Sequence, residues 1–151
     1  MGILTQWKQL GRVIDGEGVG DHSGRTVSLS RDGRTVAIGA PYNYGSDEDS
    51  GHVRIYQLDA SDQWVQVGAD IDGEAAFDEF GYSLTLSADG QTVAIGSPYN
   101  QGNNGHSGHV RIFGLGTNDQ WVQVGADIDG EASGDKSGHT VSLSTDGRTI
   151  S

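Results

Sequence analysis

Apolar and polar residues alternate with a period of two along most of the chain, and no long stretch follows the helical period. The alternation is clearest in residues 26–30 and 35–40, where Val, Leu and Ile are separated by small or hydroxylated residues. An Asp-Gly pair between these two stretches predicts a tight hairpin turn. Two further short stretches follow at 52–56 and 64–68. The pattern therefore predicts four short antiparallel β-strands joined by short connections.

The same pattern returns along the chain at a fixed spacing. Trp7, Trp64 and Trp121 are 57 residues apart, and residues 64–75 are identical to residues 121–132. A four-stranded unit of this length predicts one blade of a β-propeller. A β-solenoid is the alternative, but its coils usually contain only about 20–30 residues. We expect an all-β fold, an incomplete propeller ring in which 151 residues make about 2.65 four-stranded antiparallel blades.

The repeat spacing divides the single domain, residues 1–151, into four parts. These are an isolated fourth strand with its loop at 1–22, a first blade at 23–79, a second blade at 80–136 and a partial third blade at 137–151. Propellers close with roughly four to eight blades. We therefore expect the chain either to belong to a longer propeller or to be completed by further copies in a homo-oligomer.

Short motifs in a constant order resemble those of the FG-GAP repeat. They are Phe80-Gly81, the Gly-x-Pro sequences at 39–41 and 96–98, and the Gly-His-Val-Arg-Ile sequences that start at Gly51 and Gly108. FG-GAP repeats build the N-terminal propeller of integrin α chains. The resemblance implies a propeller fold, a binding or adhesion role and an extracellular or cell-surface location, although the start of the chain has no features of a signal peptide.

The turn between the first and second predicted strands departs from the FG-GAP pattern. Calcium-binding blades of that family have Asp-x-Asp-x-Asp-Gly at this turn, which offers several hard oxygen ligands. This chain has single carboxylates there, Asp32, Asp89 and Asp146. We expect no metal site and a thermal stability that responds little to calcium.

Composition and the lack of catalytic motifs exclude several classes of function. The chain has no Cys, so disulfides, thiolate zinc sites and thiol catalysis are excluded. The net charge of −12 argues against a nucleic-acid partner, and no apolar run is long enough for membrane insertion. No nucleophile elbow or paired-carboxylate arrangement is recognisable. We therefore expect no catalytic residue, no cofactor and no enzymatic activity.

Other conspicuous side chains favour structural interpretations. His52 and His109 each start a third strand and are a blade apart, too far to share one ion. The acidic stretch 70–74 reads as a solvated loop, because Asp70 is replaced by Val13 in the first repeat. The three tryptophans could form a sugar-stacking surface, but an aromatic residue repeated at one strand position is more typical of packing between blades.

The best candidates for ligand binding lie in the loops at one end of the predicted blades. Tyr and Asn combine contact area with hydrogen-bonding groups at a low cost in entropy. The candidate residues are Tyr42, Asn43, Tyr44, Tyr99, Asn100, Asp72 and Glu74. The alternative is that the Pro-Tyr-Asn sequence only shapes its turn. The sequence predicts a non-enzymatic module that binds a protein or a glycan, or alternatively a purely structural, self-assembling repeat protein.

Overall fold

The computed structural model describes residues 6–45, 47–102 and 105–151, and these residues form ten β-strands and no helix. The first sheet contains β1 (Thr26–Leu29), β2 (Thr35–Ala40), β3 (His52–Leu58), β4 (Trp64–Gln66) and β5 (Ile71–Asp72). The second contains β6 (Ser83–Leu86), β7 (Thr92–Ser97), β8 (His109–Leu115), β9 (Trp121–Gln123) and β10 (Ile128–Asp129). Within the described ranges, therefore, no helix could cross a membrane. The all-β prediction is confirmed.

Both sheets are antiparallel and follow the chain from strand to strand. The order β1-β2-β3-β4 of the first sheet is repeated by β6, β7 and β8 in the second, with β9 paired to β8. The Asp-Gly turns form as predicted: Asp32 Oδ1 accepts hydrogen bonds from Ser30 Oγ at 2.6 Å and from the Arg34 amide at 3.0 Å. These two bonds hold the pKa of Asp32 below its ordinary value. Asp89 and Asp146 make the same turn bonds.

The fourth strand of each blade is interrupted, which the sequence did not predict. A continuous strand at 64–68 is expected, but β4 ends at Gln66 and a separate β5 begins at Ile71, and both pair with β3. Gly68 between them has a φ of 76° and bends the chain. This bulge turns Asp70, two residues after Gly68, towards the start of β3. Bulges often redirect a side chain in this way near functional sites.

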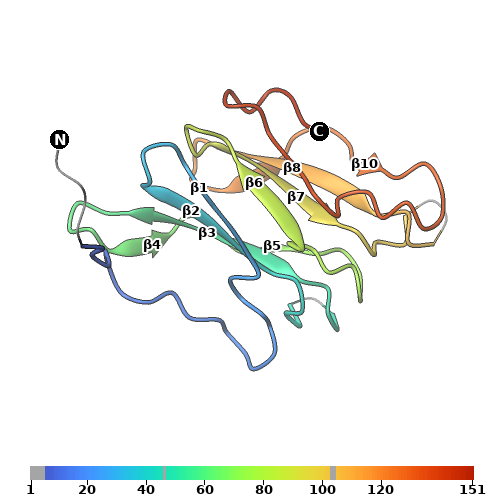
Figure 1. Ribbon diagram of the computed structural model, residues 1–151, viewed down its shortest axis with the longest axis horizontal. Coiled ribbons are helices and arrows are strands. Elements are labelled where there is room, and N and C mark those ends of the chain that lie inside the picture. The colour runs from blue at the N-terminus through green and yellow to red at the C-terminus, as the bar shows by residue number, and fades with distance from the viewer. Residues whose placement is uncertain (1–5, 46, 103–104) are drawn as a thin grey trace.

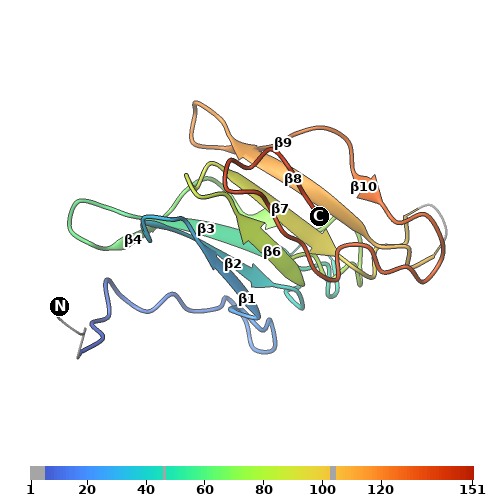
Figure 2. The same ribbon diagram turned by 45° about the horizontal axis from the view of Figure 1, so that its top comes forward.

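The two sheets lie side by side, with β6 next to β1 and β2 (Figures 1 and 2). Phe80 is fully buried between them, together with Ile55 of β3 and Val93 of β7. Each such side chain contributes about 1.5–3 kcal/mol on burial. The backbones also approach closely, because a Cβ at Gly39 would clash with the carbonyl oxygen of Gly81.

The two ends of the described chain contain no complete strand. An isolated fourth strand is predicted within residues 1–22, of which 1–5 lie outside the described residues. Residues 6–22 form no strand, because no third strand of the described chain lies beside them to pair with. This segment runs along the first sheet instead (Figure 2), where Ile14 packs against buried Val36 and Ile38. Residues 137–151 form only isolated bridges, among them Leu143 with Ile150.

Candidate functional site

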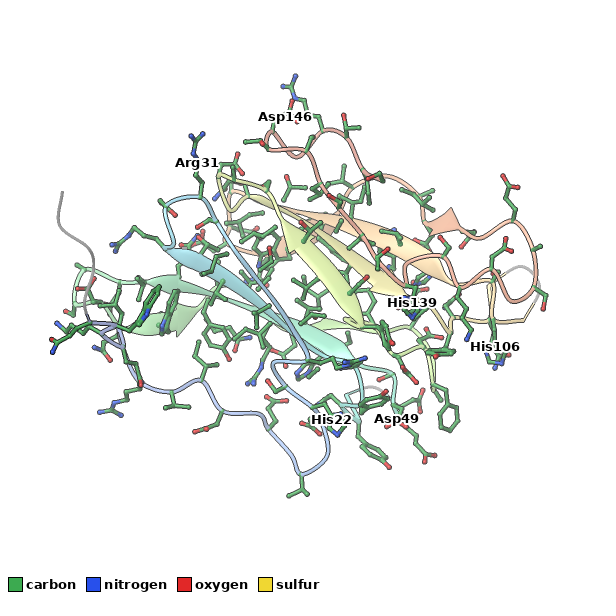
Figure 3. The ribbon with its side chains drawn as sticks, in the orientation of Figure 1. His22, Arg31, Asp49, His106, His139 and Asp146 are labelled. Carbon is green, nitrogen blue, oxygen red and sulfur yellow. The ribbon has the colours of Figure 1, made fainter. Side chains whose placement is uncertain are left out.

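The connections β2–β3 and β5–β6 meet at one end of the strands, together with their counterparts in the other repeats. The Phe77 amide donates to the Glu48 carbonyl at 2.8 Å and the Phe80 amide to the Ser50 carbonyl at 3.0 Å. Figure 3 shows labelled residues of this end along one edge of the molecule and those of the Asp-Gly turns along the opposite edge. We call the surface formed by these connections the loop face.

The two predicted asparagines hold the loop face together. Asn43 and Asn100 are buried, and each donates its side-chain amide to a carboxylate of the connection beside it. Asn43 Nδ2 donates to Asp21 Oδ2 at 2.8 Å, and Asn100 Nδ2 donates to Asp78 Oδ2 at 3.0 Å. These contacts favour the interpretation in which the asparagines shape their turns. Tyr44, in contrast, is 64% exposed on the same surface.

Aromatic and cationic side chains from neighbouring repeats form a cluster on the loop face. The rings of Tyr82 and Tyr99 meet edge-on, with centroids 6.2 Å apart. Arg25 lies over Tyr82 at 4.9 Å and Lys136 over Tyr99 at 5.0 Å from the ring centroids. His139 packs against Tyr82 with centroids 5.0 Å apart. We call these five residues the tyrosine cluster; its two tyrosine rings are half-buried, and its other three residues are exposed.

Tyr42 lies beside the tyrosine cluster in a more acidic environment. Its ring meets that of His22 edge-on, with centroids 4.9 Å apart. Burial, and then the nearby Glu79 carboxylate, raise the pKa of Tyr42. Burial and the Asp49 carboxylate raise the pKa of Glu79 in turn. Glu79 Oε2 is buried and has no hydrogen-bond partner among the described residues. This part of the loop face therefore holds a carboxyl group that is more easily protonated than usual.

The repeats keep the same backbone on the loop face but carry different side chains there. His22, Glu79 and Lys136 occupy equivalent positions, and their φ angles are 53°, 52° and 54°. Arg25, Tyr82 and His139 form a second equivalent set. Positive φ is uncommon outside glycine and tends to occur at functional sites. The repeats therefore present different side chains from one common backbone on the loop face.

A second group of polar side chains lies where one repeat meets the next. His109, at the start of β8, is buried, and its Nδ1 is 3.6 Å from Asp127 Oδ2. Glu74 of the preceding connection completes the set, and the ligand atoms of the three residues lie within 4.8 Å of one another. Burial lowers the pKa of His109, although Asp127 and Glu74 oppose that shift. We call such a set a junction cluster.

The first repeat contains an equivalent junction cluster. His52 Nδ1 is 3.6 Å from Asp70 Oδ2 and 3.8 Å from Glu17 Oε2. The bulge after β4 positions Asp70, whose Oδ1 accepts a hydrogen bond of 2.6 Å from Gln66 Nε2. Of the predicted site residues, Glu74 belongs to the second cluster, whereas Asp72 is an exposed residue at the end of β5.

Sequence reasoning missed the junction clusters because their members come from different repeats. Asp70 was discounted because its counterpart in the first repeat is Val13. The constant spacing from Glu17, His52 and Asp70 to their counterparts was the available signal.

The tryptophans connect neighbouring repeats, as the packing interpretation expects. Trp64 Nε1 donates to the Leu10 carbonyl at 3.1 Å, and Trp121 Nε1 donates to the Val67 carbonyl at 3.0 Å. Both indole rings are partly buried, and Trp121 packs against the main core. Trp7 differs because it is 99% exposed.

Comparison with known proteins shows a β-propeller-type fold. No family model and no curated protein matches the sequence. Among solved structures, the periplasmic gluconolactonase PpgL of Pseudomonas aeruginosa is similar, with a TM-score of 0.52 and 18% identity over 82% of this chain. The match covers 34% of that protein, so the chain spans about a third of its length. At this identity the likeness shows the fold alone, and the FG-GAP resemblance remains one of short motifs.

The same comparison corrects the expectation that the chain is not an enzyme. That expectation rested on the absence of familiar catalytic motifs and on an adhesion-type resemblance. The similar solved structure is an enzyme, a gluconolactonase. Sequence motifs alone therefore give no reason to exclude catalysis for this chain, whose architecture is that of a propeller blade array.

Proposed function

We propose that the chain is the ligand-binding part of a β-propeller and that its tyrosine cluster binds a carbohydrate. The observation that carries the proposal is the continuous contact between Tyr82 and Tyr99, each with a cation over its ring. Aromatic rings give a sugar an apolar surface, and the side chains around them supply hydrogen bonds. This keeps the binding role that the FG-GAP resemblance implies.

The polar surroundings favour a carbohydrate over a protein ligand. The centre of a protein–protein interface is usually depleted of charged residues. The two tyrosine rings are instead bordered by exposed Arg25, Lys136 and His139. Arg25 and Lys136 are cations in a chain with a net charge of −12, so they form a local region that suits a sugar carrying carboxylate groups.

Calorimetry with defined sugars tests the proposal. The probes are neutral oligosaccharides, uronic-acid oligosaccharides and gluconate, the last because the similar solved structure is a gluconolactonase. We expect the uronic-acid oligosaccharides to bind most tightly and Tyr99→Ala to weaken that binding at least tenfold. Tyr44→Ala is the matched control, because Tyr44 is exposed on the same face but outside the cluster. Equal effects of the two substitutions, or no binding of any probe, would contradict the proposal.

One observation favours self-assembly as a second function. Val27 and Leu29 of β1 are 62% and 57% exposed, whereas their counterparts Leu84 and Leu86 of β6 are 9% and 7% exposed because the first sheet covers them. We propose that a second copy, or a preceding blade of a longer chain, covers β1 in the same way. If copies assemble in this way, light scattering should give a mass above that of one chain, and Val27→Lys with Leu29→Lys should reduce it to one chain.

A further inference from the structure

We propose that each junction cluster binds one divalent transition-metal ion of the Zn²⁺ class, with a histidine and two carboxylates as ligands. The site is independent of the tyrosine cluster, and it revises the expectation from the sequence that the chain has no metal site. One imidazole nitrogen with carboxylate oxygens is a donor set that suits Zn²⁺ better than Ca²⁺ or Mg²⁺, which prefer oxygen alone.

The distance between the histidine and the aspartate of each cluster matches that of two ligands that share one ion. An ion about 2.0–2.2 Å from each of two donor atoms allows those atoms to be at most roughly 4 Å apart. His109 Nδ1 and Asp127 Oδ2 are 3.6 Å apart. This is too long for a hydrogen bond between them. The ring of a 2% exposed histidine thus faces a carboxylate at a separation that an ion would bridge.

The surroundings of the second cluster supply an additional unsatisfied oxygen. Asp78 is 1% exposed, and its Oδ1 has no hydrogen-bond partner among the described residues. Asp78, Glu74, His109 and Asp127 all line one concavity of about 540 Å³, together with Asp129. A buried carboxylate oxygen without a partner is costly. Asp78 therefore adds an unpaired, buried carboxylate oxygen to the lining that the second cluster shares.

The charge balance of the concavity also favours a cation. The carboxylates of Glu74, Asp78 and Asp127 line it. Arg111 provides one compensating charge, with Nη2 3.4 Å from Glu74 Oε1 and Nε 3.8 Å from Asp127 Oδ1. Its guanidinium is held in place by Gln123 Oε1, which accepts from Nε at 3.0 Å and from Nη2 at 2.8 Å. An excess of negative charge therefore remains, and a divalent ion would neutralise it.

The recurrence of the cluster indicates that it is a feature of the repeat. Glu17, His52 and Asp70 reproduce the arrangement one repeat earlier, and the histidine to aspartate distance is again 3.6 Å. The bulge after β4 recurs as well, and in both repeats a glutamine fixes the aspartate with a bond of 2.6 Å. Two bound ions per chain are therefore expected.

Calorimetry with ZnCl₂ on the purified chain tests the stoichiometry. We expect two equivalents of Zn²⁺ per chain, one after either His52→Gln or His109→Gln, and none after both substitutions together. His106→Gln is the matched control, because His106 is exposed on the loop face outside both clusters. Co²⁺ in place of Zn²⁺ should give visible absorption bands that weaken with each substitution in a cluster.

Three results would overturn the proposal. The first is a Zn²⁺ stoichiometry that the double substitution of His52 and His109 leaves unchanged. The second is tighter binding of Ca²⁺ than of Zn²⁺ at the same sites. The third concerns the variant Asp127→Asn, which is used if a histidine variant fails to fold. This substitution keeps the His109 ring and the volume of the side chain at position 127, and circular dichroism verifies that the variant is folded. An affinity at the second cluster that falls less than tenfold in this variant would refute the metal site.

Discussion

Replacing Gly39 by Ala should separate the two sheets at their closest contact. The added Cβ would lie 2.5 Å from Thr26 Oγ1 and still closer to the Gly81 carbonyl oxygen, whereas ordinary contact starts at 3.4 Å. The second sheet and β1 must therefore move by roughly 1 Å to make room. That movement also stretches the 2.9 Å hydrogen bond from Thr26 Oγ1 to the Gly81 carbonyl.

The expected loss of stability follows from these two effects. Overpacking a rigid contact costs about 1–3 kcal/mol, and losing one hydrogen bond costs about 1 kcal/mol. Gly39→Ala should thus lower the free energy of unfolding by about 2–4 kcal/mol, a large share of the total stability of a small domain.

Urea unfolding followed by circular dichroism measures this effect. The matched control is Gly114→Ala in β8, where the added Cβ meets only the side chain of Val124, at 3.2 Å, and φ is ordinary. This control should stay within about 0.5 kcal/mol of the parent chain. If Gly39→Ala is equally neutral, the sheets are not held at the described separation and the reasoning about their docking is refuted.

Three further predictions concern the core, the tryptophans and the turns. Phe80→Ala should cost about 3–5 kcal/mol in urea unfolding, because Phe80 is fully buried between the sheets. Trp121→Phe should cost about 1 kcal/mol through its lost hydrogen bond to a backbone carbonyl, whereas Trp7→Phe, at a 99% exposed position, should change only the fluorescence. The lowered pKa of Asp89 predicts that the stability difference between the parent chain and Asp89→Asn is complete above the ordinary pKa of 3.8 and disappears as pH falls through the folded value.

The sequence predicted those parts of the fold that depend on local pattern. The alternation at 35–40 and the Asp-Gly turn before it led directly to β2, because strand faces and tight turns are set by adjacent residues. The split of the fourth strand was missed, because nothing in the alternation shows that Gly68 adopts a positive φ. The packing of Ile14 against Val36 and Ile38 was also missed, because this contact exists only in the folded chain.

The candidate sites depended still more on tertiary structure. Tyr42 and Tyr99 were singled out by residue type, yet Tyr82, Arg25 and Lys136 were not, because their meeting requires one repeat to dock against the next. The junction clusters were missed for the same reason. Repeat spacing identifies equivalent residues, but it does not reveal which members of neighbouring repeats touch.

The docking of the sheets through glycine and backbone carbonyl groups has an evolutionary consequence. Gly39 against Gly81 in the first contact is repeated by Gly96 against Gly138 in the second. Main-chain atoms are present whatever the side chains are. A duplicated unit therefore already has the backbone surface that packs against its neighbour. A unit added or removed in a whole step of 57 residues would therefore keep this backbone contact with its neighbours.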